Sequence, residues 1–142
     1  MDNENSESTN ERQDKMVNKA VYHILNNDTA INALVTGVFP IVMPEGTQAP
    51  CLVFQRETLD VTYDKSGAVI DSSDVAVIMF AKSYPDVVDI TDAVRSALEL
   101  VKGVHNGVTV IHSRVRRGEE GYDIESDTYF QKLTFSITTS KI

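Results

Sequence analysis

Cysteine and histidine are the residue types through which this chain could carry out covalent or metal chemistry. Cys51 is the only cysteine, and it opens the apolar run CLVF, so we expect a small buried core residue rather than a nucleophile. The three histidines, His23, His105 and His112, are far apart, and none has a second ligand at metal-binding spacing. A pair of Cys51 with a histidine across the fold remains open, but no local motif supports it.

The acids around a predicted turn are the second group with possible chemistry: Asp60, Asp64, Asp71 and Asp74. They could bind a hard cation, but they lack the spaced ligand loop that calcium prefers. We therefore expect solvated acids at the tip of a hairpin. The seven glycines are scattered, and none forms a motif that holds a phosphate group. The sequence predicts no catalytic residue, no cofactor and no metal site.

A basic cluster followed by an acidic run is the third feature. Arg114, Arg116 and Arg117 alternate along a predicted strand, and five acids follow: Glu119, Glu120, Asp123, Glu125 and Asp127. Mixed charge is poorly suited to nucleic acid but suits a self-complementary subunit interface. A solvated edge strand whose charges deter aggregation fits equally well. The predicted interface residues are Asp64, Lys65, Asp71, Arg114, Arg116, Arg117, Glu119 and Glu120.

Length and charge limit the kind of protein and the partners. With 142 residues and a net charge of −8, we expect one domain and no binding to nucleic acid or an anionic membrane. Residues 1–13 are polar and predict a flexible acidic arm, which leaves residues 14–142 as a single domain. Neither a signal peptide nor an apolar run of about 20 residues is found, so we expect a soluble protein that is not exported.

The apolar periodicity predicts the elements that position these residues. Helical stripes predict helices in residues 14–25, 28–36 and 83–102, and alternation predicts strands in residues 51–63, 72–82, 108–117 and 129–138. The apolar side chains change sides midway along the predicted strand of residues 51–63, which indicates a bulge near residues 56–58. Residues 118–127 read as an acidic connection. The predicted fold class is α+β, with an antiparallel sheet of about four strands in two hairpins, helices on one face, and the order α-α-β-β-α-β-β.

A proline-rich segment precedes the first predicted strand. Three of the four prolines, Pro40, Pro44 and Pro50, fall there together with Gly46, and none brings a reactive group. Proline fixes φ and lacks an N–H donor, so we predict a rigid elbow between the helical layer and the first long strand.

Several short motifs follow one another in a recognisable order: AINALV (30–35), GVFP (37–40), PEGTQAP (44–50), LVFQR (52–56), FAKSY (80–84), DITDAVRSAL (89–98) and YFQKLTFSI (129–137). In this order they resemble the tail-completion family of long-tailed bacteriophages, of the head–tail joining or tail-terminator type. The resemblance extends over about residues 17–140. The acidic N-terminal arm departs from the commoner family pattern and suggests an additional contact.

The resemblance implies an α+β subunit of the virion without catalytic residues. Such a subunit forms a ring, usually a hexamer, at the head-proximal end of the tail, where it stops polymerisation of the tube. The implied partners are further copies of the chain, the tail tube protein and a neck or connector protein, with assembly in the bacterial cytoplasm. Three alternatives stay open: an adaptor contacting the portal, a small hydrolase using Cys51 or the hairpin acids, and a module that binds a host protein.

Overall fold

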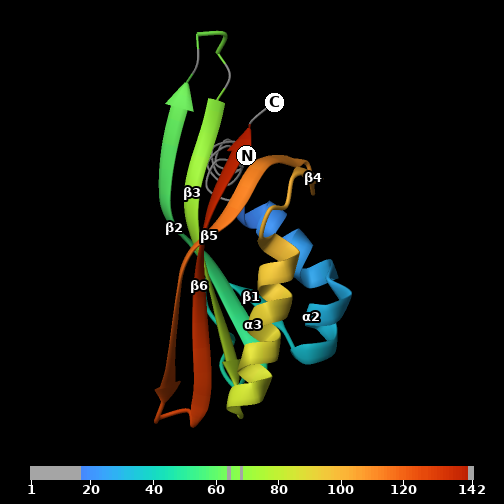
Figure 1. Cartoon of the computed structure of the whole chain (residues 1–142), viewed down its shortest axis with the longest axis vertical. Coiled ribbons are helices and arrows are strands. Elements are labelled where there is room, and N and C mark those ends of the chain that lie inside the picture. Colours follow the sequence, from blue (N-terminus) through green and yellow to red (C-terminus); the bar gives the residue numbers. More distant parts are fainter. Residues whose placement is uncertain (1–16, 64, 68, 141–142) are drawn as a thin grey trace, which may run out of the picture.

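The computed structural model describes residues 17–63, 65–67 and 69–140, so the predicted arm lies outside the described residues. Helices occupy residues 17–27, α2 (Thr29–Leu34) and α3 (Tyr84–Leu98). The strands are β1 (Val38–Pro40), β2 (Cys51–Tyr63), β3 (Val69–Ala81), β4 (Gly103–His105), β5 (Val108–Asp123) and β6 (Thr128–Ser140). Figure 1 shows the long strands side by side, with the β2–β3 hairpin extending past the helices.

Local side-chain hydrogen bonds begin the second and third helices. The Asp28 carboxylate accepts a hydrogen bond from the backbone N–H of Ile31 at 3.0 Å, and the Ser83 hydroxyl accepts one from Asp86 at 3.3 Å. Each bond satisfies a backbone donor that has no partner within the helix, which confirms both predicted caps. The third helix ends earlier than predicted, at Leu98, because the chain then turns so that the Leu100 N–H donates to the Ser113 carbonyl at 2.8 Å.

The predicted fold class, α+β with about four antiparallel strands in the order α-α-β-β-α-β-β, is wrong. The structure is mostly β, with 50% of the described residues in strands and 26% in helices, and its sheet forms a half-barrel. The sheet has six strands in the order β1-β2-β3-β6-β5-β4. It is mixed, because β1 runs parallel to β2 whereas the other neighbours are antiparallel.

The two strands that sequence reasoning missed are both short. β1 pairs Val38–Pro40 with Leu52–Phe54, and β4 pairs Gly103–His105 with Val108–Val110. Three residues are too few to display an alternation of period two, and β1 ends in a proline, which argues against a strand. Their pairing is decided by the neighbouring long strands rather than by their own composition.

A bulge in β2 brings the apolar residues of its two halves to the same face. The pairing with β3 shifts between Arg56 and Thr58, as the sequence predicts. Leu52 and Phe54 before the bulge and Leu59 after it therefore face the same side of the sheet. Without the extra residue, Leu59 would point to the opposite side, because side chains alternate along a strand.

The predicted acidic connection at residues 118–127 is also wrong over most of its length. β5 continues to Asp123, and only residues 124–127 form the turn into β6. Gly118 and Gly121 lie inside the strand: a Cβ added at Gly121 would lie 2.7 Å from the Phe130 ring, and one at Gly118 would lie 3.3 Å from the Leu133 side chain. These glycines let neighbouring side chains approach the backbone closely, so they do not end the strand.

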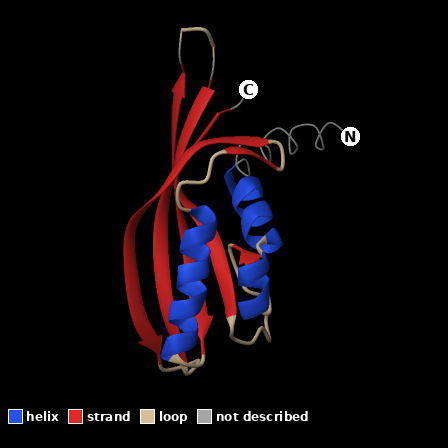
Figure 2. Cartoon of the chain, turned by 45° about the vertical axis from the view of Figure 1, so that its right-hand side comes forward, coloured by secondary structure: helices blue, strands red, loops and turns tan. Residues whose placement is uncertain are grey.

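One hydrophobic core lies between the helices and one face of the sheet. Figure 2 shows the helices on the same side of the sheet; this side is called the inner face, and the opposite side the outer face. The core joins apolar residues of all layers: Val17, Val21, Leu25, Ile31, Leu52, Phe54, Val75, Val77, Met79, Val87, Ile90, Val94, Leu98, Leu133, Phe135 and Ile137. Among the described residues, no helix has the length and apolar character needed to span a membrane.

Replacement of Phe135 tests this core. Its side chain is fully buried in β6 between β3 and β5, so Phe135→Ala should lower the free energy of unfolding by about 3–5 kcal/mol through lost burial and a residual cavity. Urea unfolding followed by circular dichroism measures the change. The control Val104→Ala removes a side chain that is 69% exposed, and should change the stability by less than about 0.5 kcal/mol. Equal effects of both substitutions would contradict the assigned core.

Candidate functional site

The outer face carries charged side chains from all four of the long strands. The Arg116 guanidinium reaches across β6 to the Asp74 carboxylate on β3, with an N–O distance of 2.6 Å. The Lys132 ammonium on β6 lies 3.3 Å from Glu57 on β2 and 3.9 Å from Glu119 on β5. Because all five side chains are partly solvated, each pair contributes little stability, but together they hold the side chains in one arrangement.

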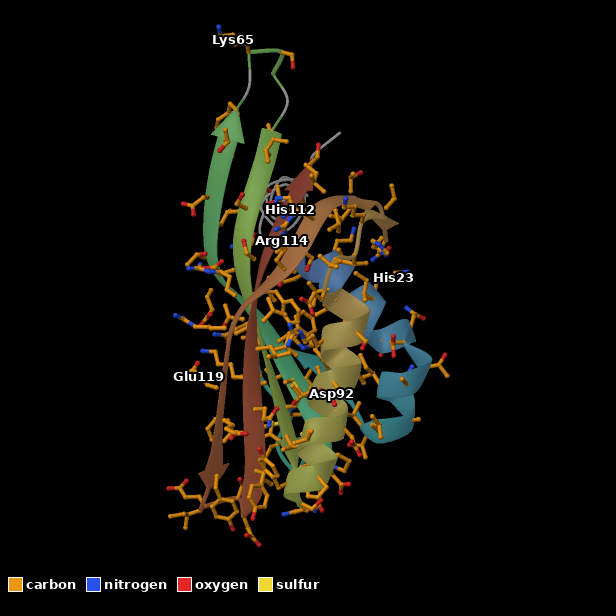
Figure 3. All side chains as sticks on the ribbon, viewed as in Figure 1. His23, Lys65, Asp92, His112, Arg114 and Glu119 are labelled. Atoms are coloured by element: carbon orange, nitrogen blue, oxygen red, sulfur yellow. The ribbon has the colours of Figure 1, made fainter. Side chains whose placement is uncertain are left out.

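The three predicted basic residues differ in whether they are paired within the chain. Arg116 is held by Asp74, so its charge is partly neutralised. Arg114 and Arg117 are exposed and lie on the outer face of β5, opposite Ser136 and Thr134 of β6. Within the described part of the chain neither has a hydrogen-bond or ion-pair partner. Figure 3 shows Arg114 on the upper half of the strand and Glu119 lower on it. Two cations are thus available to an external acid.

The predicted acids Glu119 and Glu120 lie on opposite faces, because side chains alternate along β5. Glu119 is on the outer face near Lys132. The Glu120 carboxylate accepts hydrogen bonds from the Tyr84 hydroxyl at 2.8 Å and from the Gln131 amide at 2.9 Å. Glu120 thus connects the first turn of α3 to β5 and β6, so the two acids do not form a single acidic patch.

The charged residues predicted at the β2–β3 hairpin do not lie together. Lys65 is exposed at the tip (Figure 3), whereas Asp71 is buried in β3 and only 8% exposed. Asp64 lies outside the described residues. In the part of the chain that the structure describes, no group of three or more histidine, cysteine or acidic residues is arranged to hold a metal ion.

Cys51 is buried at the start of β2, and burial raises the pKa of its thiol. A raised pKa lowers the fraction of nucleophilic thiolate at neutral pH. The Cys51 sulfur lies 3.3 Å from the sulfur of Met43, which belongs to the proline-rich segment. The hydrogen-bond partners of His23 and His105 come from their own neighbourhoods, Asn27 and Lys102. No described histidine is hydrogen-bonded to Cys51.

A cluster of tyrosines around Glu120 was not predicted from the sequence. The Tyr129 ring centroid lies 5.9 Å from that of Tyr84 and 5.0 Å from that of Tyr122, both in edge-on geometry. Tyr84 and Tyr122 are 46% exposed, so the cluster is open to solvent. Facing positions of the β5–β6 hairpin could have indicated the Tyr122–Tyr129 pair, whereas the contact of Tyr84 depends on the placement of α3.

Comparison with known proteins finds a family and a fold. The family model described as Tail completion protein gp17 matches residues 19–140. No curated protein matches the sequence significantly. A solved structure described as the virion of native gene transfer agent (GTA) particle contains a similar chain, with a TM-score of 0.63 and 24% identity. The match covers 86% of this chain and 92% of that one, and at this identity it shows the fold alone.

The hydrogen bond between Tyr84 and Glu120 should be visible in a titration. The bond to the carboxylate, and then its negative charge, raise the pKa of Tyr84 above the usual 10.0. Glu120→Gln should therefore lower the pKa of Tyr84 towards the usual value, which the NMR shift of its ring carbons measures. Glu119→Gln, on the opposite face of β5, should leave it unchanged. An unaltered Tyr84 titration in Glu120→Gln would show that the bond does not form in solution.

Proposed function

The chain belongs to the family of the tail completion protein gp17, and from that premise we propose that it forms a ring which closes the head-proximal end of a bacteriophage tail. In this position the ring ends polymerisation of the tail tube and joins the tube to the neck. The match over residues 19–140 carries the proposal, since it covers nearly all of the described chain. The family is one of structural tail proteins, and no step of this function requires catalysis.

The partners of such a ring are further copies of the chain, the tail tube protein and a neck or connector protein. A hexamer is the proposed stoichiometry, assembled in the cytoplasm of the bacterial host. The shared fold with a chain of a gene transfer agent virion supports a place in a particle of this kind. The acidic arm of residues 1–13 is proposed to add a contact on assembly.

The β2–β3 hairpin is the proposed contact with the tube or with a neighbouring copy. It extends beyond the helical layer (Figure 1), and Tyr63 near its tip is 72% exposed. An exposed aromatic ring on a paired strand loses little conformational freedom on binding, and tyrosine is enriched in protein interfaces. Lys65 at the turn adds a charge for orientation.

Charge on the outer face is proposed to orient neighbouring copies. Arg114 and Arg117 have no acid partner in the described chain, and the chain carries a net charge of −8, so acids are abundant on the surface of a second copy. Complementary charge mainly sets orientation and the rate of association. Arg116 contributes less, because Asp74 of the same chain already accepts its hydrogen bond.

Binding to purified particles tests the function. We expect the full chain to bind isolated tail tubes at one end, as seen by electron microscopy, and native mass spectrometry of the assembled material to show a ring of defined stoichiometry. Binding to portal complexes but not to tubes would instead favour an adaptor of the neck. A chain that binds neither and remains monomeric at all concentrations would contradict the proposal.

Charge reversal tests the role of the two arginines. Arg114→Glu with Arg117→Glu should weaken the oligomer at low salt more than at high salt, because screening reduces interactions between exposed charges. Analytical ultracentrifugation across salt concentrations measures this. Lys19→Glu with Lys102→Glu is the matched control: it makes the same two charge reversals at exposed residues in the first helix and after α3, and should leave assembly intact. An oligomer insensitive to both arginine changes at every salt concentration would exclude this role.

A further inference from the structure

The sheet has a partly uncovered strand edge on each side. β1 pairs with β2 only as far as Phe54, and no strand of the described chain continues this pairing over residues 55–63, called the β2 edge. On the other side, β4 and the Leu100 N–H cover β5 as far as Ser113. Residues 114–123, called the β5 edge, have no described neighbour there. Backbone N–H and C=O groups on such edges are ready to pair with another strand.

A tight turn is responsible for the early end of β1. The Ile41 N–H donates to the Phe54 carbonyl at 2.8 Å, and the Val42 N–H then turns back to the Pro40 carbonyl at 2.7 Å. This turn gives Ile41 a φ of 67°, which β-branched residues rarely adopt. The chain thus adopts an unfavourable backbone conformation at the point where further pairing with β2 would otherwise be possible. The β2 edge stays open as a result.

The two edges have suitable directions to pair between copies. β2 runs antiparallel to β3, β3 to β6, and β6 to β5, so β5 runs antiparallel to β2. The edges lie on opposite sides of one sheet and therefore meet only when a second copy is placed beside the first. A copy related by rotation would continue the sheet with an antiparallel pair, in a head-to-tail arrangement that can close into a ring.

The strand register within one copy determines how far the next copy must shift along the strand direction for the two edges to pair. Gly118 pairs with Leu133, Leu133 with Val77 and Val77 with Phe54, so Gly118 is level with Phe54. The middle of the β2 edge is Leu59, which pairs with Ser73, four residues along β3 from Val77 because of the bulge. Matching the two edges then shifts each copy by about 13 Å along the strands over about 19 Å across four strand spacings. The resulting tilt of about 35° lies at the lower end of the range of closed barrels, about 35–45°.

Side chains at this register are complementary in shape and charge. Leu59 of one copy would face Gly118 of the next on the inner side, beside a depression of about 300 Å³ that is lined by Gly118, Glu119, Glu120, Gln131 and Leu133. Asp60 would face Arg117 on the outer side. Both are exposed, and neither has an ion-pair partner among the residues that the structure describes. A leucine of the next copy would pack into this depression beside Leu133, and the two charges would pair next to it.

We propose that copies of this chain join head to tail by antiparallel pairing of the β2 edge of one copy with the β5 edge of the next. Asp60 of one copy then lies beside Arg117 of the next, with Leu59 over Gly118. The inference rests on the proposed ring and adds the strands that form its interface. Every copy uses both edges, so closure leaves neither edge exposed.

Cysteine cross-linking tests the register. Directly opposed antiparallel residues have Cβ atoms about 4.5–5.5 Å apart, close to the disulfide range of about 3.5–4.5 Å. In the full chain with Asp60→Cys and Arg117→Cys, mild oxidation of the assembled protein should produce a ladder of linked copies on a non-reducing gel, which a reductant reverses. The native Cys51 is buried and can stay. Either substitution alone should give no ladder, nor should Asp60→Cys with Asp92→Cys on the exposed side of α3.

A charge swap provides a second, independent measurement. Asp60→Arg should abolish the ring mass in native mass spectrometry, and adding Arg117→Asp to the same chain should restore it. Rings that form normally without a cross-linked ladder, and that tolerate Asp60→Arg, would overturn the edge pairing but leave the proposed ring intact. A wild-type chain that remains monomeric both alone and with tail tubes would overturn the ring and the edge pairing together.

Discussion

The packing of α3 against the central strands is the contact on which the rest of this structure depends. Val87, Ile90 and Val94 of the helix are buried in the same core as Val77 of β3 and Phe135 of β6. These two strands have neighbours on both sides, so the contact decides which face of the whole sheet is covered. The bulge in β2 then becomes necessary, since it brings Leu59 to the covered side with Phe54.

In the part of the chain that the structure describes, the helices cover only one face of the sheet, and no strand pairs with the outer sides of β2 and β5 over residues 55–63 and 114–123. On the outer face, the ion pairs Arg116–Asp74 and Lys132–Glu57 each link two strands that are separated by one strand of the sheet. Charges of this kind keep an open sheet from aggregating without blocking a specific partner. A subunit of the proposed ring would need both properties, and closure of that ring would satisfy the backbone groups at the edges of the described sheet.

Much of the local structure could be predicted from the sequence, because short-range rules decide it. The caps at Asp28 and Ser83, the strand of residues 51–63 and the bulge after Arg56 follow from hydrogen-bonding side chains and alternation. The order of short motifs was sufficient for the family. The glycines at 118 and 121 misled the prediction, since their role is to accommodate Leu133 and Phe130, and those contacts are known only when β5 lies beside β6.

The sequence by itself determined the family, the absence of a recognisable catalytic motif and the position of the charged residues along the chain. Only the tertiary structure decided which of those charges remain available. Arg116 is paired with Asp74, 42 residues away in the sequence, whereas Arg114 and Arg117 are not paired in the described chain. It also decided that β1 and β4 stop after three residues and leave two edges open. The reason is physical: pairing partners and edge cover are long-range properties, set by which strands become neighbours in the sheet.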